Sequence, residues 1–143
     1  MRNLSWLLLS AACAAAAEPP PHLEIVFTMT RNGSPMAEVT ERLEYTGASY
    51  QLTETWKGRG LYSLLGSARR FSQGSVSGGT LRPHEFFDER SGRDTARAWF
   101  DWKAQTITMQ HGGRKGTEEM PPNSQDRLSF LLAVTMMPGR VKT

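Results

Sequence analysis

Cysteine is almost absent from this sequence, which has one in 143 residues, at position 13. A disulfide-bonded scaffold needs an even set of cysteines, and a structural zinc site needs several Cys or His ligands. The chain adds only three histidines, His22, His84 and His111. A disulfide scaffold and a zinc site are therefore excluded, and we expect no metal and no cofactor.

Long hydrophobic segments and an excess of one charge are lacking as well. The mean hydropathy is -0.46, too low for a protein with several membrane spans. The 17 basic and 14 acidic residues nearly balance, unlike the charges of a disordered polyelectrolyte. The length and composition are those of one small globular domain.

The N-terminus has the organisation of a secretory signal peptide. Met1-Arg2-Asn3 supplies a positive start, residues 4–12 are apolar, and Ala15-Ala16-Ala17 supplies small residues for cleavage. A helix needs about 20 apolar residues to cross a membrane, so a permanent anchor is disfavoured. We expect cleavage after Ala17, a periplasmic location, and a linker over residues 18–22.

A lipoprotein signal is the alternative. Ser10-Ala11-Ala12-Cys13 has the small residues and the cysteine of a lipobox, although Ser10 occupies a position that is usually Leu. In that case the protein would be anchored through a lipid on Cys13. Cleavage after Ala17 would instead leave a mature chain without cysteine.

Alternating apolar and polar residues recur between turn signals along the remaining chain. We predict one β-rich domain over residues 23–143. Leu23, Ile25 and Phe27 alternate with polar neighbours, and Asn32-Gly33 is typical of a hairpin turn. Connections this short can join strands only antiparallel. We therefore predict a mainly β fold, a curved antiparallel meander forming a partial barrel. Further strands are expected at 36–45, 50–56, 68–76, 80–90, 95–102 and 106–111, with a last one ended by Pro121-Pro122.

Two helices interrupt the predicted strands. Apolar residues at 61, 62, 64 and 65 favour a short helix near 61–65, and Gly66 is placed to end it. A C-terminal helix is predicted near 124–137, with Ser124 offering a capping side chain and Asp126 in the first turn. In the motif Gln125-Asp126-Arg127, we expect Asp126 to neutralise free backbone N–H groups and Arg127 to pair with the sheet. A buried ion pair would then fix the helix on the sheet.

Aromatic residues on one predicted strand suggest an apolar ligand. Alternation places Trp99 on one face and Phe100 with Trp102 on the other, so both faces are covered or one meets a ligand. The candidate ligand-binding residues are Phe86, Trp99, Phe100 and Trp102. Core packing is the alternative use of these side chains.

The charges are unevenly distributed. Residues 18–54 carry six acids and two bases, whereas residues 55–143 carry fourteen bases and eight acids. A basic surface could dock on lipid headgroups or on an acidic envelope partner. Cross-strand ion pairing, such as that of Arg90 or Arg93 with Glu85 or Asp94, is the competing interpretation. Nucleic acid is not an expected partner, because no recognition motif accompanies the basic residues. The candidate docking residues are Arg69, Arg70, Arg93 and Arg97.

Catalysis is the least supported function class. His84-Glu85 lacks the second histidine of a metalloprotease helix. A hydrolase-like site would require His84, Glu85, Asp101 or Asp126 to converge in one pocket. No catalytic residue is predicted.

Several segments together resemble one protein family. The resemblance covers residues 22–138, and its most specific part is the last segment. The segments are Arg31-Asn32-Gly33, residues 60–66, Leu81-Arg82-Pro83, Phe100-Asp101-Trp102 and residues 121–129. They resemble the proteobacterial domain-of-unknown-function family 3108 (DUF3108), whose members are exported envelope proteins without an assigned activity. The resemblance implies a strongly curved antiparallel sheet with further strands after the C-terminal helix. We therefore expect this chain to be truncated at its C-terminus.

Three functions remain in order of preference. The first is a non-enzymatic periplasmic module that binds or shields an apolar, lipid-like group, by analogy with half-barrels that carry lipoproteins. The second is an envelope scaffold that docks through the basic surface. The third is a hydrolase-like enzyme with an unrecognised site.

Overall fold

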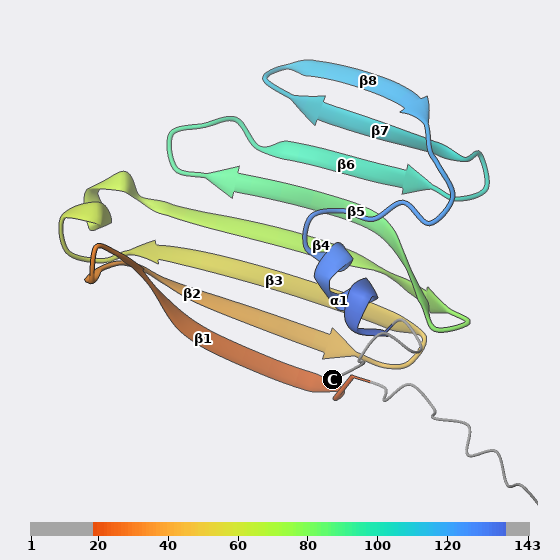
Figure 1. The fold of residues 1–143 in the computed structure, drawn as a ribbon. Coiled ribbons are helices and arrows are strands. Elements are labelled where there is room, and N and C mark those ends of the chain that lie inside the picture. Colours follow the sequence, from red (N-terminus) through yellow and green to blue (C-terminus); the bar gives the residue numbers. More distant parts are fainter. Residues whose placement is uncertain (1–18, 137–143) are drawn as a thin grey trace, which may run out of the picture.

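The computed structural model describes residues 19–136, which form one antiparallel sheet with a helix packed on it (Figure 1). The elements are β1 (His22–Arg31), β2 (Ser34–Tyr45), β3 (Ser49–Gly58), the 3₁₀ helix η1 (Gly60–Leu65), β4 (Ser67–Ser77), β5 (Thr80–Arg90), β6 (Ala96–Asp101), β7 (Thr106–His111), β8 (Arg114–Glu119) and α1 (Ser129–Met136).

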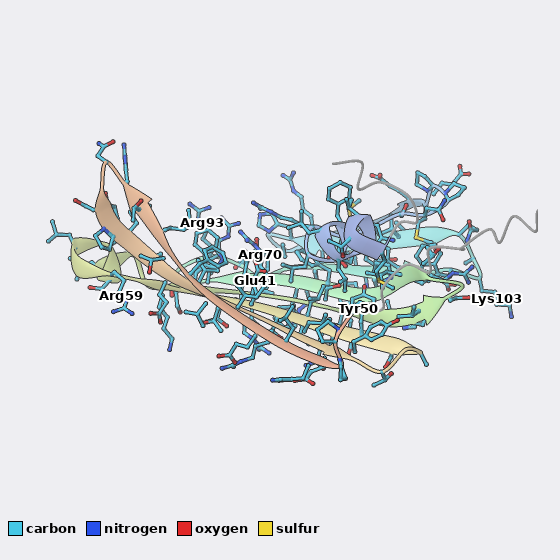
Figure 2. The ribbon with its side chains drawn as sticks, turned by 60° about the horizontal axis from the view of Figure 1, so that its bottom comes forward. Glu41, Tyr50, Arg59, Arg70, Arg93 and Lys103 are labelled. Atoms are coloured by element: carbon cyan, nitrogen blue, oxygen red, sulfur yellow. The ribbon has the colours of Figure 1, made fainter. Side chains whose placement is uncertain are left out.

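The eight strands lie side by side in sequence order, and every neighbouring pair is antiparallel. The sheet does not close on itself, so β1 and β8 are its two edges. This confirms the predicted mainly β meander. We call the face of the sheet that carries α1 the helix face and the opposite one the outer face (Figure 2).

The first turn shows how local sequence sets this topology. Asn32 and Gly33 both have positive φ, 50° and 77°. Two residues in this conformation twist the backbone as the flanking strands twist, and Asn-Gly adopts it at low cost. The predicted hairpin between β1 and β2 is thus confirmed.

The core lies on the helix face, between the sheet and α1. Its buried members are Leu43, Tyr45, Tyr50, Leu81 and Met136. They come from β2, β3, β5 and the end of α1, so the helix completes a core that the sheet alone would leave open. Leu52, Val76, Leu132 and Ala133 pack against this cluster.

A β-bulge aligns β5 with that core. The β4–β5 register shifts between Gln73 and Gly74, and beyond the shift Leu81 and Pro83 are fully buried. A side chain at Gly74 would collide with the backbone carbonyl of Arg82. Gly74 is therefore required by the close approach of the two strands.

The structure corrects the bounds of the C-terminal helix. It was expected near 124–137 with Ser124 as its cap, but α1 begins at Ser129, and the Ser124 hydroxyl donates to the carbonyl of Pro121 at 2.7 Å. The predicted helix near 61–65 is the 3₁₀ helix η1, and the strand expected before Pro121 is β8.

The signal peptide, its cleavage after Ala17, and Cys13 lie outside the described residues. Within residues 19–136, no helix is long and apolar enough to span a membrane.

Gly74→Ala is expected to lower the free energy of unfolding by about 1–3 kcal/mol, because the added methyl group forces β4 and β5 apart. Gly116→Ala is the control, since a side chain on β8 at Gly116 meets no atom within 4 Å. Urea unfolding of the two variants checks this. Equal stability losses would contradict the proposed role of Gly74.

Candidate binding groove under helix α1

An apolar groove of about 230 Å³ lies between α1 and the first three strands. Leucine and isoleucine side chains dominate its wall, and several stay accessible: Leu131 is 64% exposed and Ile25 is 44% exposed. The apolar lining is Leu23, Ile25, Leu43, Leu52, Leu128, Leu131 and Leu132, and the polar lining is Glu41, Arg42, Thr53, Glu54 and Thr135. A concave, mostly apolar site with few polar groups is the usual form of a small-molecule site.

The wall of the groove that α1 forms depends on the hydrogen bonds at the start of this helix. One carboxylate oxygen of Asp126, Oδ1, accepts the backbone N–H groups of Leu128 at 2.8 Å and Ser129 at 2.9 Å. The Ser129 hydroxyl oxygen accepts the backbone N–H of Asp126 in return, at 3.0 Å. This reciprocal pair is a capping box with serine in the place of the usual Glu or Gln.

The second carboxylate oxygen of Asp126 ties the helix to the sheet. The Ser72 hydroxyl donates to it at 2.6 Å, and the Tyr50 hydroxyl lies 3.1 Å from the Ser72 oxygen. A serine hydroxyl has one hydrogen, so Tyr50 must donate to Ser72. All three side chains are buried, and burial, with the charge of Asp126, raises the pKa of Tyr50 well above its ordinary value. The phenol thus stays a donor at every physiological pH.

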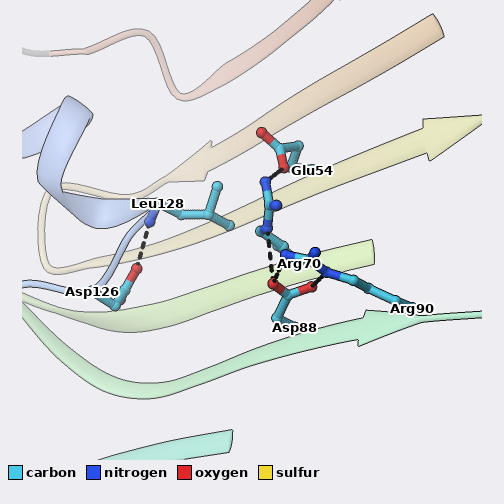
Figure 3. A network of polar contacts seen from close by, with 6 residues as sticks. All are labelled: Glu54, Arg70, Asp88, Arg90, Asp126 and Leu128. Carbon is cyan, nitrogen blue, oxygen red and sulfur yellow. Dashed lines mark hydrogen bonds and ion pairs between the residues drawn. The ribbon is translucent and has the colours of Figure 1, made fainter. Parts of the chain in front are cut away.

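Beyond the groove, the helix face carries a cluster of charges (Figure 3). Arg70 on β4 pairs with Glu54 on β3 and, at 3.2 Å, with Asp88 on β5. Arg90 also pairs with Asp88, at 2.8 Å. Burial alone would raise the pKa of Asp88, but hydrogen bonds from Arg90 and Arg70 and the charges of both hold it below its ordinary value.

Glu41 is the carboxylate that this cluster leaves unneutralised. It lies on β2 directly opposite Glu54 on β3 and opposite Ile25 on β1. Within residues 19–136, no hydrogen bond or ion pair reaches its carboxylate, although it lines the groove. Burial and the charge of Glu54 raise the pKa of Glu41 above its ordinary value. A partly buried acid therefore stands at the side of an apolar groove.

Comparison with known families gives one result. The sequence model described as "Protein of unknown function (DUF3108)" matches residues 25–142. The chain belongs to the DUF3108 family. Comparisons with curated proteins and with solved structures gave no significant match.

The predicted aromatic site of this DUF3108 protein is not assembled. Trp99 is paired with Glu85 and lies on the outer face, with the Lys115 ammonium 5.4 Å from its ring centre. Phe86 on β5 and Phe100 on β6 alternate onto the helix face, and Trp102 lies in the turn after β6. None of the three lines the groove under α1. Phe100 is buried, and the Trp102 indole donates to the carbonyl of Pro83 at 2.6 Å.

The predicted docking arginines also separate. Arg70 is buried in the charge cluster and cannot dock a partner, which corrects its assignment to a surface. Arg69 lies over the stacked rings of Phe71 and Phe87 on the outer face. On the same face Arg97 lies over the Phe87 ring and 3.7 Å from Glu85. Arg93 is exposed in the connection after β5.

The candidate catalytic residues have separate structural partners. The His84 ring lies 3.2 Å from the Ser75 hydroxyl, and Asp101 accepts the N–H groups of the turn that follows it. Glu85 binds Gln73 and Arg97. In residues 19–136, no hydrogen bond or ion pair joins these side chains to one another or to Asp126, and no three possible metal ligands cluster.

The motif Gln125-Asp126-Arg127 has a structural role, which differs from the one expected. The Gln125 amide donates to the carbonyl of Leu81 at 2.8 Å, so it anchors the helix start to β5. Asp126 caps the helix as predicted, but its partner on the sheet is Ser72 and not a cation. Arg127 is exposed and forms no ion pair within the described part of the chain.

Sequence reasoning missed the groove residues. The alternation of Leu23 and Ile25 predicts their strand, and the helix predicted near 124–137 includes Leu131 and Leu132. No local signal showed that this helix would meet β1 to β3. Glu41 was visible only as one of several acids.

Asp126→Ala is expected to lower the free energy of unfolding by about 2–4 kcal/mol, since it removes the cap and leaves the Ser72 hydroxyl buried without an acceptor. Asp126→Asn keeps a side-chain oxygen for the cap and should lose less. Arg127→Ala, at the exposed neighbour, is the control. Urea unfolding measures all three, and a loss for Asp126→Ala no larger than for Arg127→Ala would refute this role.

Glu41→Gln is expected to stabilise the protein at pH 7, raising Tm by about 1–3 °C, as for a screened interaction of below 1 kcal/mol. The folded state binds the Glu41 proton more tightly than the unfolded chain does. The tighter binding of this proton therefore stabilises the folded protein fully below the ordinary pKa of 4.5. This stabilisation is lost as the pH rises through the raised pKa of Glu41 in the folded state. Thermal unfolding at pH 7 and pH 4 checks this, because the gain should vanish at pH 4. A gain of equal size at both pH values would exclude a titrating Glu41 as its cause.

Proposed function

We propose that this protein is an exported, non-enzymatic module that binds a single aliphatic chain in the groove under α1. The observation that carries the proposal is the groove itself, in whose wall leucine and isoleucine side chains predominate. Removing aliphatic carbon from water into such a site is worth about 0.8 kcal/mol per CH₂ group. Export is inferred from the organisation of residues 1–17 and makes the cell envelope the compartment of the ligand.

The dimensions of the groove favour a narrow ligand. Its volume of about 230 Å³ is below the roughly 300–1,000 Å³ of sites that enclose drug-sized ligands. One alkyl chain fits this description better than a two-chain lipid. The groove is also open enough to leave Leu131 and Ile25 partly in water, where an apolar ligand would cover them.

The proposal replaces the aromatic residues first suggested for the ligand with those of the groove. Docking through the basic surface has less support, since Arg70 is buried and Arg97 is paired with Glu85. A hydrolase-like site has no support from the described residues, since His84, Glu85, Asp101 and Asp126 have separate structural partners.

The test is a calorimetric titration of the full chain with 1-octanol, an uncharged eight-carbon chain. We expect saturable binding that Leu131→Gln weakens at least about threefold, because the variant loses apolar contact in the groove. Phe130→Gln is the matched control: Phe130 is a neighbouring, exposed helix residue outside the groove lining. Absence of saturable binding, or equal weakening by both substitutions, would overturn the proposal.

A further inference from the structure

The groove combines an apolar wall with one uncompensated negative charge. On the helix face, three carboxylates, those of Glu41, Glu54 and Asp88, stand on adjacent or nearby strands. Two guanidinium groups, those of Arg70 and Arg90, face them. Among residues 19–136, the ion pairs that form use Glu54 and Asp88, so Glu41 is the one of these three carboxylates without a cationic partner.

The other charged residue of the lining does not change this balance. Arg42 is adjacent to Glu41 in the chain, so its side chain points to the outer face. There its guanidinium pairs with Glu24, which lies opposite it on β1. Arg127 is exposed and is not part of the lining. Among the described residues of the lining, the unpaired charge offered to a ligand is therefore that of Glu41.

From this arrangement we propose that the ligand is a single-chain amphiphile with a protonated amine, whose alkyl chain fills the groove and whose ammonium group pairs with Glu41. This inference rests on the proposed function and names its ligand class. Glu41 lies between Ile25 and Glu54, so a cation beside it would contact both the apolar wall and the acidic side. Glu41 lines the groove and Arg70 belongs to the neighbouring charge cluster; both are labelled in Figure 2.

Charge complementarity disfavours the other amphiphiles. A fatty acid or a phosphate-bearing lipid would bring an anion to a site where Glu41 has no cation of its own. An alcohol would leave the carboxylate without a counter-charge. An amine relieves the repulsion between Glu41 and Glu54, and a charge-assisted hydrogen bond to a carboxylate is stronger than one between neutral groups.

The groove is too small to favour a protein partner. Stable protein–protein interfaces bury about 1,200–2,000 Å² in total and involve roughly 20–30 residues on each partner, whereas twelve residues line this groove. A small molecule is therefore the occupant that we propose.

The experiment compares three ligands with the same eight-carbon chain: octylamine, 1-octanol and octanoate at pH 7. We expect octylamine to bind about three to ten times more tightly than 1-octanol, and octanoate to bind more weakly than either. In Glu41→Gln the preference for octylamine over 1-octanol should disappear. Glu44→Gln is the matched control, since it removes the same charge from the same strand on the outer face, where Glu44 pairs with His22.

The outcomes separate the two proposals. If 1-octanol binds but octylamine binds no better, or if Glu41→Gln leaves the preference intact, the amine assignment is wrong and the apolar groove remains. A preference for octanoate would also overturn it. If none of the three ligands binds, the proposed function itself fails and the amine assignment fails with it.

Discussion

The buried carboxylate of Asp126 is the constraint on which the rest of the site depends. A carboxylate taken out of water is costly unless its oxygens are hydrogen-bonded. Here one oxygen accepts two backbone N–H groups of the helix start, and the other accepts the Ser72 hydroxyl. The same group therefore begins α1 and attaches it to β4. An eight-residue helix is not stable alone. The Asp126 carboxylate that positions α1 on the sheet therefore also allows α1 to form.

The helix face is divided by this attachment into an apolar part and a charged part. Under α1 the sheet contributes Leu43 and Leu52 to a core that Met136 completes. Beyond the helix, Arg70 links Glu54 and Asp88 across three strands, and its guanidinium lies 5.5 Å from the ring centre of Trp56. A buried cation needs such partners, and the cluster supplies them. Glu41 lies where the two parts meet. We expect its charge to lower the stability of the folded protein at pH 7, which is typical of a residue kept for function.

The fold was predictable from the sequence because its signals are local. Asn32-Gly33 determines a turn within four residues, and period-two alternation determines a strand within six. The site depends on longer separations: Ser72 and Asp126 are 54 residues apart, and the Glu41–Glu54 pairing depends on the β2–β3 register. Alternation placed Trp99 and Phe100 on opposite faces but could not say which face α1 would cover. Alternation also implied that Arg69 and Arg70 face opposite sides, which excludes a surface formed by both.

The two edges of the sheet differ in a way that matters for the groove. Every residue of β8 is exposed, and four of its six residues are charged, which protects an open edge against pairing with other strands. Edge strand β1 instead exposes Leu23, Ile25, Val26 and Phe27. Two of these, Leu23 and Ile25, are groove-lining residues. Apolar residues on an open edge favour association between chains, so a ligand in the groove would cover part of the surface that most needs covering. Ligand binding and protection of the β1 edge would then depend on the same side chains.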